Sequence, residues 1–222
     1  MNTQAIIFDF DGVILDTEHA IYSSWRQQYH QHGQDLAMSD WVKVLGMPSN
    51  HRDFHGELEA LTGKTFDRDE LKARRVAFVE AELKDVPPRE GIVDYLECAK
   101  QRNLKIAVAS GSGHDWVEGH AKQLNLHHYF DAFICREDTQ EHKPYPGPFL
   151  AAAQTVGADP TRCIAIEDSP NGIRSAKAAG MFAVAYPTDM TRGEDFAAIE
   201  ADRVVHSLAD VPLDELLNGD HA

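Results

Sequence analysis

Two aspartates separated by one residue, Asp9 and Asp11, are the first side chains whose spacing suggests chemistry. The apolar run from Ala5 to Phe8 precedes them and predicts a strand buried on both faces. In a strand, side chains two residues apart point to the same side, so both carboxylates can face one space at a sheet edge. Two ionised carboxylates this close repel each other unless a cation lies between them, and a divalent metal ion is the expected partner. The alternative is a strand followed by an acidic turn that does no chemistry.

A serine–glycine segment, Ser110 to Gly113, follows a second apolar run. A hydroxyl group and exposed backbone N–H groups at the start of a helix together form an anion site. The alternative is a turn in which Ser112 or Asp115 caps the following helix. Trp116 stands at the third glycine position of a dinucleotide-binding fingerprint, so that fingerprint is absent.

Two further polar positions follow later in the chain. Lys143 stands in the run H-K-P-Y-P-G-P-F, where prolines stiffen the loop and an ammonium group suits a phosphate. Glu167 and Asp168 end an apolar strand, and Ser169-Pro170 then predicts a helix cap and first turn. Acids at a helix start are favourable without a metal. Together with the first two aspartates, however, they supply the oxygen ligands that Mg²⁺ prefers.

These side chains need a sheet edge to bring them together. Strands are predicted at 5–8, 105–110, 132–135, 163–167, 182–185 and 203–205, with helices at 92–101, 115–126, 146–156, 171–179 and from about 212. Such alternation predicts an α/β fold with a Rossmann-like, doubly wound parallel sheet, whose ligands bind at the carboxyl edge. Apolar residues recur at helical spacing from 16 to 86, and Pro87-Pro88 ends that pattern. We therefore predict a core domain of residues 1–15 and 88–222 with an inserted helical cap domain of residues 16–87.

Composition excludes several classes of partner. A formal net charge of −15 argues against nucleic acid and anionic membranes, and no apolar run is long enough to span a bilayer. No signal peptide is visible, and Cys98, Cys135 and Cys163 are expected to be reduced, buried thiols of a cytoplasmic protein. We expect the 12 histidines to be surface or cap residues. Nothing demands a dimer, so a monomer is expected.

Four of these segments, in this order, resemble the four motifs of the haloacid dehalogenase (HAD) superfamily. They are D-F-D-G-V from Asp9 to Val13, Ser110, Lys143-Pro144, and E-D-S-P-N-G-I from Glu167 to Ile173. The closest likeness is to the β-phosphoglucomutase-like phosphatase group, and the predicted insertion resembles a cap of type C1. The resemblance therefore implies an HAD core and a Mg²⁺-dependent phosphatase acting on a small phosphorylated metabolite, expected to be a sugar phosphate.

The resemblance also implies roles for individual residues. Asp9 would be the nucleophile that forms an aspartyl-phosphate, and Asp11 the general acid and then base. Ser110 and Lys143 would bind the transferring phosphoryl group. The implied metal set is Asp9, Asp11 (through its main-chain carbonyl), Glu167 and Asp168. The implied substrate-binding set is Glu18, Gly46, Arg52, Gly111, Ser112 and His114.

Three positions depart from the mutase pattern of that group. Gly113 stands where a mutase carries a lysine, Ser49 where it carries an arginine, and Ile21 where it carries a histidine. Arg52 or His51 could partly substitute. The departures favour a phosphatase, while a sugar phosphomutase and a catalytically weak phosphometabolite-binding module remain alternatives.

Overall fold

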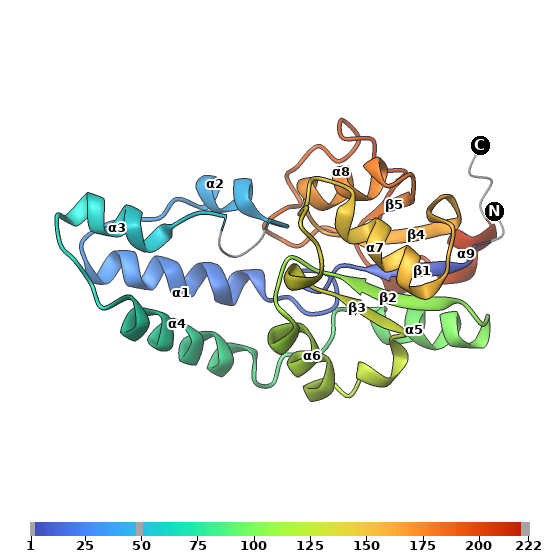
Figure 1. The fold of residues 1–222 in the computed structure, drawn as a ribbon, viewed down its shortest axis with the longest axis horizontal. Coiled ribbons are helices and arrows are strands. Elements are labelled where there is room, and N and C mark those ends of the chain that lie inside the picture. Colours follow the sequence, from blue (N-terminus) through green and yellow to red (C-terminus); the bar gives the residue numbers. More distant parts are fainter. Residues whose placement is uncertain (1–2, 48–50, 219–222) are drawn as a thin grey trace.

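The structure is a computed structural model that describes residues 3–47 and 51–218. Its centre is a sheet of six parallel strands in the order β3-β2-β1-β4-β5-β6 (Figure 1). The strands are β1 (Ala5–Phe8), β2 (Lys105–Ala109), β3 (Ala132–Ile134), β4 (Cys163–Glu167), β5 (Phe182–Ala185) and β6 (Arg203–Val204). The chain adds strands on one side of β1 and then, from β4, on the other. This switch point is where ligands bind in doubly wound sheets, and Asp9 and Asp11 follow β1 there.

Helices cover both faces of the sheet because neighbouring residues of β1 point in opposite directions. Ile6 and Phe8 enter one apolar cluster, whereas Ala5 and Ile7 enter the other. The helices α5 (Ile92–Gln101), α6 (His114–Gln123) and α9 (Leu213–Asn218) pack on the first face. The helices α7 (Gly147–Val156) and α8 (Pro170–Ala178) pack on the second. The predicted doubly wound α/β fold is confirmed.

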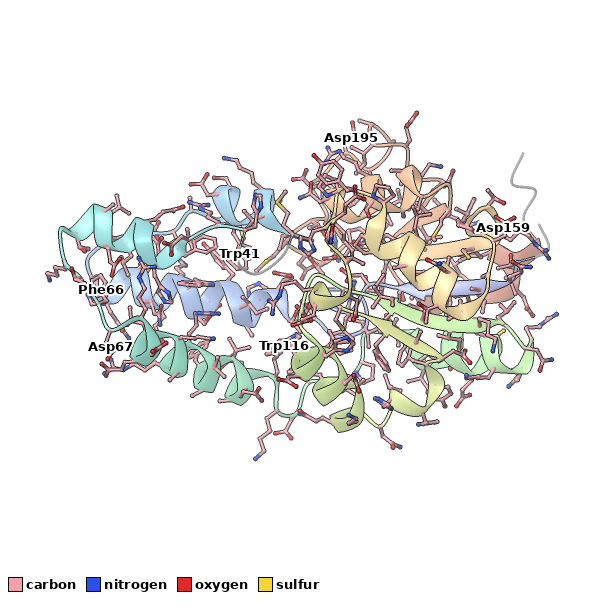
Figure 2. All side chains as sticks on the ribbon, in the orientation of Figure 1. Trp41, Phe66, Asp67, Trp116, Asp159 and Asp195 are labelled. Atoms are coloured by element: carbon pink, nitrogen blue, oxygen red, sulfur yellow. The ribbon has the colours of Figure 1, made fainter. Side chains whose placement is uncertain are left out.

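Four further helices lie between β1 and α5 and extend away from the sheet (Figure 1). We call α1 (Glu18–Gln31), α2 (Met38–Trp41), α3 (Phe54–Thr62) and α4 (Arg68–Leu83) the cap helices. They bury an apolar cluster of their own, which includes Trp25, Tyr29 and Trp41. Trp41 lies among the cap helices in Figure 2. Short 3₁₀ turns occur at Val42–Val44, His127–Tyr129, Arg136–Asp138, Pro160–Arg162 and Leu208–Asp210.

Local sequence explains where the cap helices begin and how the chain returns to the sheet. The carboxylates of Asp53 and Asp67 accept hydrogen bonds from the first N–H groups of α3 and α4. After α4, the Arg89 guanidinium donates to the main-chain carbonyls of Gly12, Tyr186 and Pro187. Arg89 therefore ties the return connection to the loop that follows Asp11.

The cap helices touch the core at several points. The Asn171 side chain donates to the Leu45 carbonyl (2.9 Å), and the Gln123 side chain donates to the Lys84 carbonyl (3.0 Å). Trp116 lies where α6 approaches the cap helices (Figure 2). Within residues 3–47 and 51–218, no helix combines the length and apolarity that a bilayer-spanning segment requires.

Several sequence predictions need correction in detail. The helix predicted for 115–126 begins at His114 and ends at Gln123. Cys98 is only half-buried, whereas Cys135 and Cys163 are buried, and all three are free thiols. His120 is buried on α6 and is not a surface residue. Ser169 caps α8 as predicted, because its hydroxyl accepts from the Gly172 N–H.

Candidate active site

The carboxyl ends of β1 and β4 bring three acids together around one lysine. Lys143 Nζ lies 2.9 Å from Asp9 Oδ1 and 2.5 Å from Glu167 Oε1. One carboxylate oxygen from each of Asp9, Glu167 and Asp168 lies within 4.8 Å of the other two. All four side chains are buried. Residues that are 134 positions apart in the sequence, Asp9 and Lys143, therefore share one polar cluster.

The electrostatics of this cluster favour the binding of another positive charge. Burial raises the pKa of Asp9 well above its ordinary value, the charge of Glu167 raises it further, and Lys143 lowers it. Burial also raises the pKa of Asp168, with additional effects from Glu167 and Asp9. Burial lowers the pKa of Lys143, but the charges of Asp9 and Glu167 outweigh this and raise it overall. One ammonium group cannot balance three carboxylates, so the cluster favours a further cation.

The residues present fit a magnesium ion. Asp168 Oδ2 is buried and has no hydrogen-bond partner within the part of the chain that the structure describes, which leaves a ligand oxygen free. Gly12 lies against that carboxylate with φ +78°, and a Cβ at Gly12 would lie 2.2 Å from Asp168 Oδ2. Glycine at this position therefore permits the close approach of backbone and acid. Hard carboxylate and carbonyl oxygens are the ligands that Mg²⁺ prefers.

Glu167 is held in place by donors and offers little free ligand capacity. Its Oε1 accepts from Lys143, and its Oε2 accepts from the N–H groups of Asp168 and Ser169 and from the Ser169 hydroxyl. A Cβ at Gly172 would lie 1.8 Å from this carboxylate. The geometry suits a residue that orients Lys143 and the Asp168 loop rather than one that binds a metal directly.

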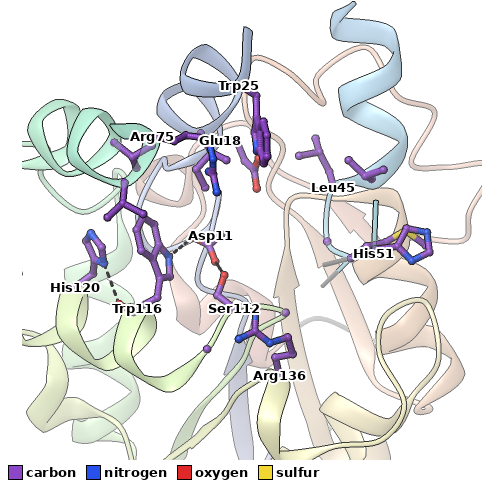
Figure 3. Close-up of a pocket in the computed structure, with 18 of the residues that line it drawn as sticks. Asp11, Glu18, Trp25, Leu45, His51, Arg75, Ser112, Trp116, His120 and Arg136 are labelled. Carbon is purple, nitrogen blue, oxygen red and sulfur yellow. Dashed lines mark hydrogen bonds between the residues drawn. The ribbon is translucent and has the colours of Figure 1, made fainter. Parts of the chain in front are cut away.

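The Asp11 side chain lines an adjoining cleft, where it lies beside Trp116 and Ser112 (Figure 3). Its Oδ1 accepts from the Thr17 hydroxyl (2.8 Å) and the Trp116 indole N–H (2.8 Å), and its Oδ2 accepts from the Ser112 hydroxyl (2.6 Å). Ser110 Oγ lies 3.5 Å from Asp11 Oδ2. Gly113 occupies the N-cap position of α6 without a side-chain cap, so the capping role considered for Ser112 or Asp115 is not observed.

The cleft, of about 820 Å³, lies between the core and the cap helices. Five of the six residues predicted to bind substrate line it: Glu18, Gly46, Arg52, Gly111 and Ser112. His114 is not on its wall; its imidazole hydrogen-bonds Glu118 and Asp138 instead. Ser49, which bears on the mutase alternative, lies outside the described residues.

Glu18 lies where the first cap helix meets the cleft. Burial raises its pKa to about 8, with smaller contributions from the charges of Asp11 and Asp9. The Trp41 indole N–H lies 3.3 Å from its Oε2. Glu18 therefore favours the protonated form at neutral pH and can donate a hydrogen bond into the cleft.

Two arginines on the cap side of the cleft differ in their partners. The Arg52 guanidinium already pairs with a carboxylate: its Nε and Nη2 lie 2.6 and 2.7 Å from the two oxygens of Glu57. Arg75, on α4, packs its guanidinium 4.1 Å from the Trp25 ring, and its buried Nε has no hydrogen-bond partner. Within the described residues, no carboxylate lies within 4.0 Å of the Arg75 guanidinium. Burial alone lowers the pKa of Arg75 to about 10.

A family model described as haloacid dehalogenase-like hydrolase matches residues 3–180. The chain belongs to this family. The hydrolase is 38% identical over 215 residues to YhcW of Bacillus subtilis (strain 168). This alignment covers 97% of the present chain and 96% of YhcW. It is 34% identical over 179 residues to the fructose-1-phosphate phosphatase YqaB of Escherichia coli (strain K12). This alignment covers 81% of the present chain and 94% of YqaB.

Solved structures share the fold of this hydrolase. The crystal structure of CbbY from Rhodobacter sphaeroides in complex with phosphate matches with a TM-score of 0.75 and 25% identity, covering 94% of this chain and 96% of that one. The crystal structure of β-phosphoglucomutase from Clostridium difficile matches with a TM-score of 0.76 and 23% identity, covering 96% and 95%. The second likeness shows the fold alone.

Sequence reasoning missed three residues of the hydrolase's site, of which Trp116 and Arg75 line the cleft and Thr17 contacts Asp11. Thr17 and Trp116 bind the Asp11 carboxylate, and no local pattern marks either of them. Arg75 carried a usable signal: it stands four residues after Leu71 and four before Val79, both buried. A basic residue on the apolar face of a helix indicates a charge that is held at an interface or a site.

Proposed function

We propose that this hydrolase is a Mg²⁺-dependent phosphatase that hydrolyses a small phosphorylated metabolite, a sugar phosphate, through an aspartyl-phosphate on Asp9. The observation that carries the proposal is the Lys143 ammonium group, 2.9 Å from Asp9 and beside an acid cluster suited to a divalent ion. A positioned nucleophile next to fixed positive charge is what phosphoryl transfer requires. Pure binding of a phosphorylated ligand requires no such nucleophile.

The chain's own residues divide the reaction into two displacements. An Asp9 oxygen attacks phosphorus and the bond to the alcohol oxygen breaks, while Asp11 gives its proton to that leaving oxygen. Asp11 then takes a proton from a water molecule, whose oxygen attacks the same phosphorus and releases Asp9 and inorganic phosphate. Lys143 and the Ser110 hydroxyl hold the phosphoryl oxygens. Mg²⁺ bound by Asp9, Asp168 and the Asp11 carbonyl would neutralise the charge of those oxygens.

The cleft supports a small polar substrate. Its volume of about 820 Å³ suits a metabolite rather than a protein segment. On the cap side, Arg75 supplies a guanidinium with no carboxylate partner among the described residues, Glu18 supplies a carboxyl group, and Trp25 and Trp41 form apolar walls. Such a set suits sugar hydroxyls, and the name of the relative YqaB, a fructose-1-phosphate phosphatase, agrees with this substrate class.

The test is phosphate release from a panel of sugar phosphates and from an aryl phosphate, with and without Mg²⁺. We expect release that requires Mg²⁺ and is reduced at least about a thousandfold in Asp9→Asn. Asp94→Asn, which changes an exposed aspartate of α5, should leave activity unchanged. Release by Asp9→Asn at a tenth of the wild-type rate would rule out covalent catalysis, and no release from any ester would favour the binding module.

A second measurement tests the covalent intermediate without a substitution. With an added alcohol, a shared aspartyl-phosphate partitions between alcohol and water in a ratio that does not depend on the ester supplied. A ratio that varies with the leaving group would contradict the proposal. Conversion of one sugar phosphate isomer into another would support the mutase alternative.

A further inference from the structure

A second group of possible metal ligands lies outside the acid cluster of the cleft. One ligand atom from each of His114, Cys135 and Asp138 lies within 4.8 Å of the other two. His114 begins α6, Cys135 follows β3, and Asp138 ends the next 3₁₀ turn. His114 and Asp138 are about one-third exposed, and Cys135 is buried. The group is therefore partly open to solvent.

The local backbone holds two of these ligands in a fixed relation. The Cys135 N–H donates to Asp138 Oδ2 (2.7 Å), and the Cys135 sulfur accepts from the Asp138 N–H. This reciprocal pair places the thiol and the carboxylate side by side. His114 Nε2 lies 2.7 Å from the same Asp138 oxygen and completes the triangle.

The far side of the imidazole is also organised as at a metal site. His114 Nδ1 lies 3.1 Å from Glu118 Oε1, one turn further along α6. Metal-binding histidines commonly donate their second ring N–H to a carboxylate, which orients the ring and increases its basicity. The other Glu118 oxygen lies 3.2 Å from both His127 and Lys122, which anchor it.

We propose that His114, Cys135 and Asp138 bind a divalent ion of the zinc class, with Glu118 orienting the histidine. A thiolate, an imidazole and a carboxylate form a mixed set that favours Zn²⁺ over Mg²⁺, because Mg²⁺ prefers oxygen ligands alone. Three protein ligands leave the fourth tetrahedral position for water from the open side.

The site adjoins the part of the chain that holds Asp11. His114 is two residues from Ser112, whose carbonyl accepts from the Arg136 N–H (2.9 Å) and whose hydroxyl donates to Asp11. An ion that links the start of α6 to the segment after β3 would therefore fix the two segments between which Ser112 lies.

The test uses Co²⁺ as a spectroscopic replacement for Zn²⁺, added to the full chain in saturating Mg²⁺. We expect one equivalent to produce a thiolate-to-cobalt charge-transfer band in the near ultraviolet, and one equivalent of Zn²⁺ to remove it. The band should be lost in Cys135→Ser and in His114→Ala. Glu118→Gln should retain it with affinity reduced about 10–100-fold.

Matched controls locate the ligands. Cys98→Ser should keep the band, although the Cys98 thiol lies 3.8 Å from Asp214 Oδ1, and so should His206→Ala, which changes an exposed histidine. His114→Ala changes a half-exposed residue and retains all three cysteines, so this variant remains informative if Cys135→Ser does not fold. Absence of a thiolate band in the wild-type chain, or its persistence in Cys135→Ser, would overturn the proposal and leave a hydrogen-bonded network only.

Discussion

The active site has two ends with opposite imbalances of charge: a core end, formed by the acid cluster that adjoins the cleft, and a cap end, formed by the cap helices that line the cleft. At the core end, Asp9 and Glu167 share the Lys143 ammonium group and Asp168 lies beside these two acids, so negative charge is in excess. At the cap end, Arg75 has no acidic partner among the described residues, so positive charge is in excess. The comparison suggests that a metal ion completes the first end and that the substrate completes the second.

The largest expected effect comes from removing the cation of the core end. Lys143→Met should reduce activity at least about a thousandfold and lower the free energy of unfolding by about 3 kcal/mol, because it leaves buried acids without a partner. Denaturant unfolding in a chelator-treated buffer measures the second effect. Lys177→Met, which breaks the half-exposed pair with Asp202 (2.7 Å), should cost less than about 1 kcal/mol. Similar losses in both variants would contradict the comparison.

Asp11 belongs to the core end but faces the cleft, so its loss should depend on the substrate. Asp11→Asn should slow hydrolysis of alkyl esters about 10²–10⁴-fold, because their leaving oxygens need a proton. Activated aryl esters should lose much less. Steady-state kcat on a matched pair of esters makes the measurement, and equal losses on both would count against an acid role.

Glu18 lies between the two ends and provides a test by pH. Its folded-state pKa of about 8 lies above the ordinary value of 4.5, so its contribution to stability is complete below pH 4.5 and is lost as the pH rises through 8. Without metal, Glu18→Gln should reduce the fall in unfolding free energy between about pH 5 and pH 9 by roughly 2–4 kcal/mol. Glu97→Gln, which changes an exposed residue of α5, should have no such effect. An unchanged pH slope in Glu18→Gln would show that this carboxyl group titrates normally.

Arg75 tests the cap end directly. Arg75→Ala should raise KM about tenfold with a smaller change in kcat, because it removes a binding contact that is remote from the phosphoryl group. Arg74→Ala is the matched control: Arg74 is the neighbouring residue of α4, is exposed, and pairs with Glu70 (2.5 Å). An unchanged KM in Arg75→Ala would remove the cap end from substrate binding.

Arg52 provides the smallest and sharpest contrast. Its guanidinium already has a two-point pair with Glu57, so Arg52→Ala should change KM less than about twofold. The same substrate titration measures it. A change as large as that of Arg75→Ala would mean that the Glu57 pair opens when the substrate binds.

The core was readily predicted from the sequence because its patterns are local. The strands 163–167 and 182–185 and the helix 92–101 have the predicted limits, since apolar runs and turn residues mark them directly. Ser169 correctly predicted the start of α8, because a helix cap is also a local signal. The limits of α6 were less accurate, because Gly113 precedes it without a side-chain cap.

The cap side of the cleft was predicted less well because its residues are chosen by packing between elements. Nothing local distinguishes Arg52, which pairs with Glu57, from Arg75, which packs on Trp25 and has no acidic partner among the described residues; only their surroundings do. The family resemblance implied a substrate-binding role for His114, yet the structure turns its ring towards Glu118 and Asp138. The first side chain of a helix can point towards either neighbouring segment, and the local sequence does not decide which.

The sequence by itself determined the strand ends, and with them the acids and the lysine that a parallel sheet must deliver to one edge. It could do so because apolar runs, glycine turns and helix caps act over a few residues. Only the tertiary structure decided which charges are balanced: among the described residues it left an oxygen of Asp168 without a hydrogen-bond donor and the Arg75 guanidinium without a carboxylate, and it brought His114 to Cys135. Such pairings depend on segments far apart in the chain, where a shift of one turn exchanges one partner for another.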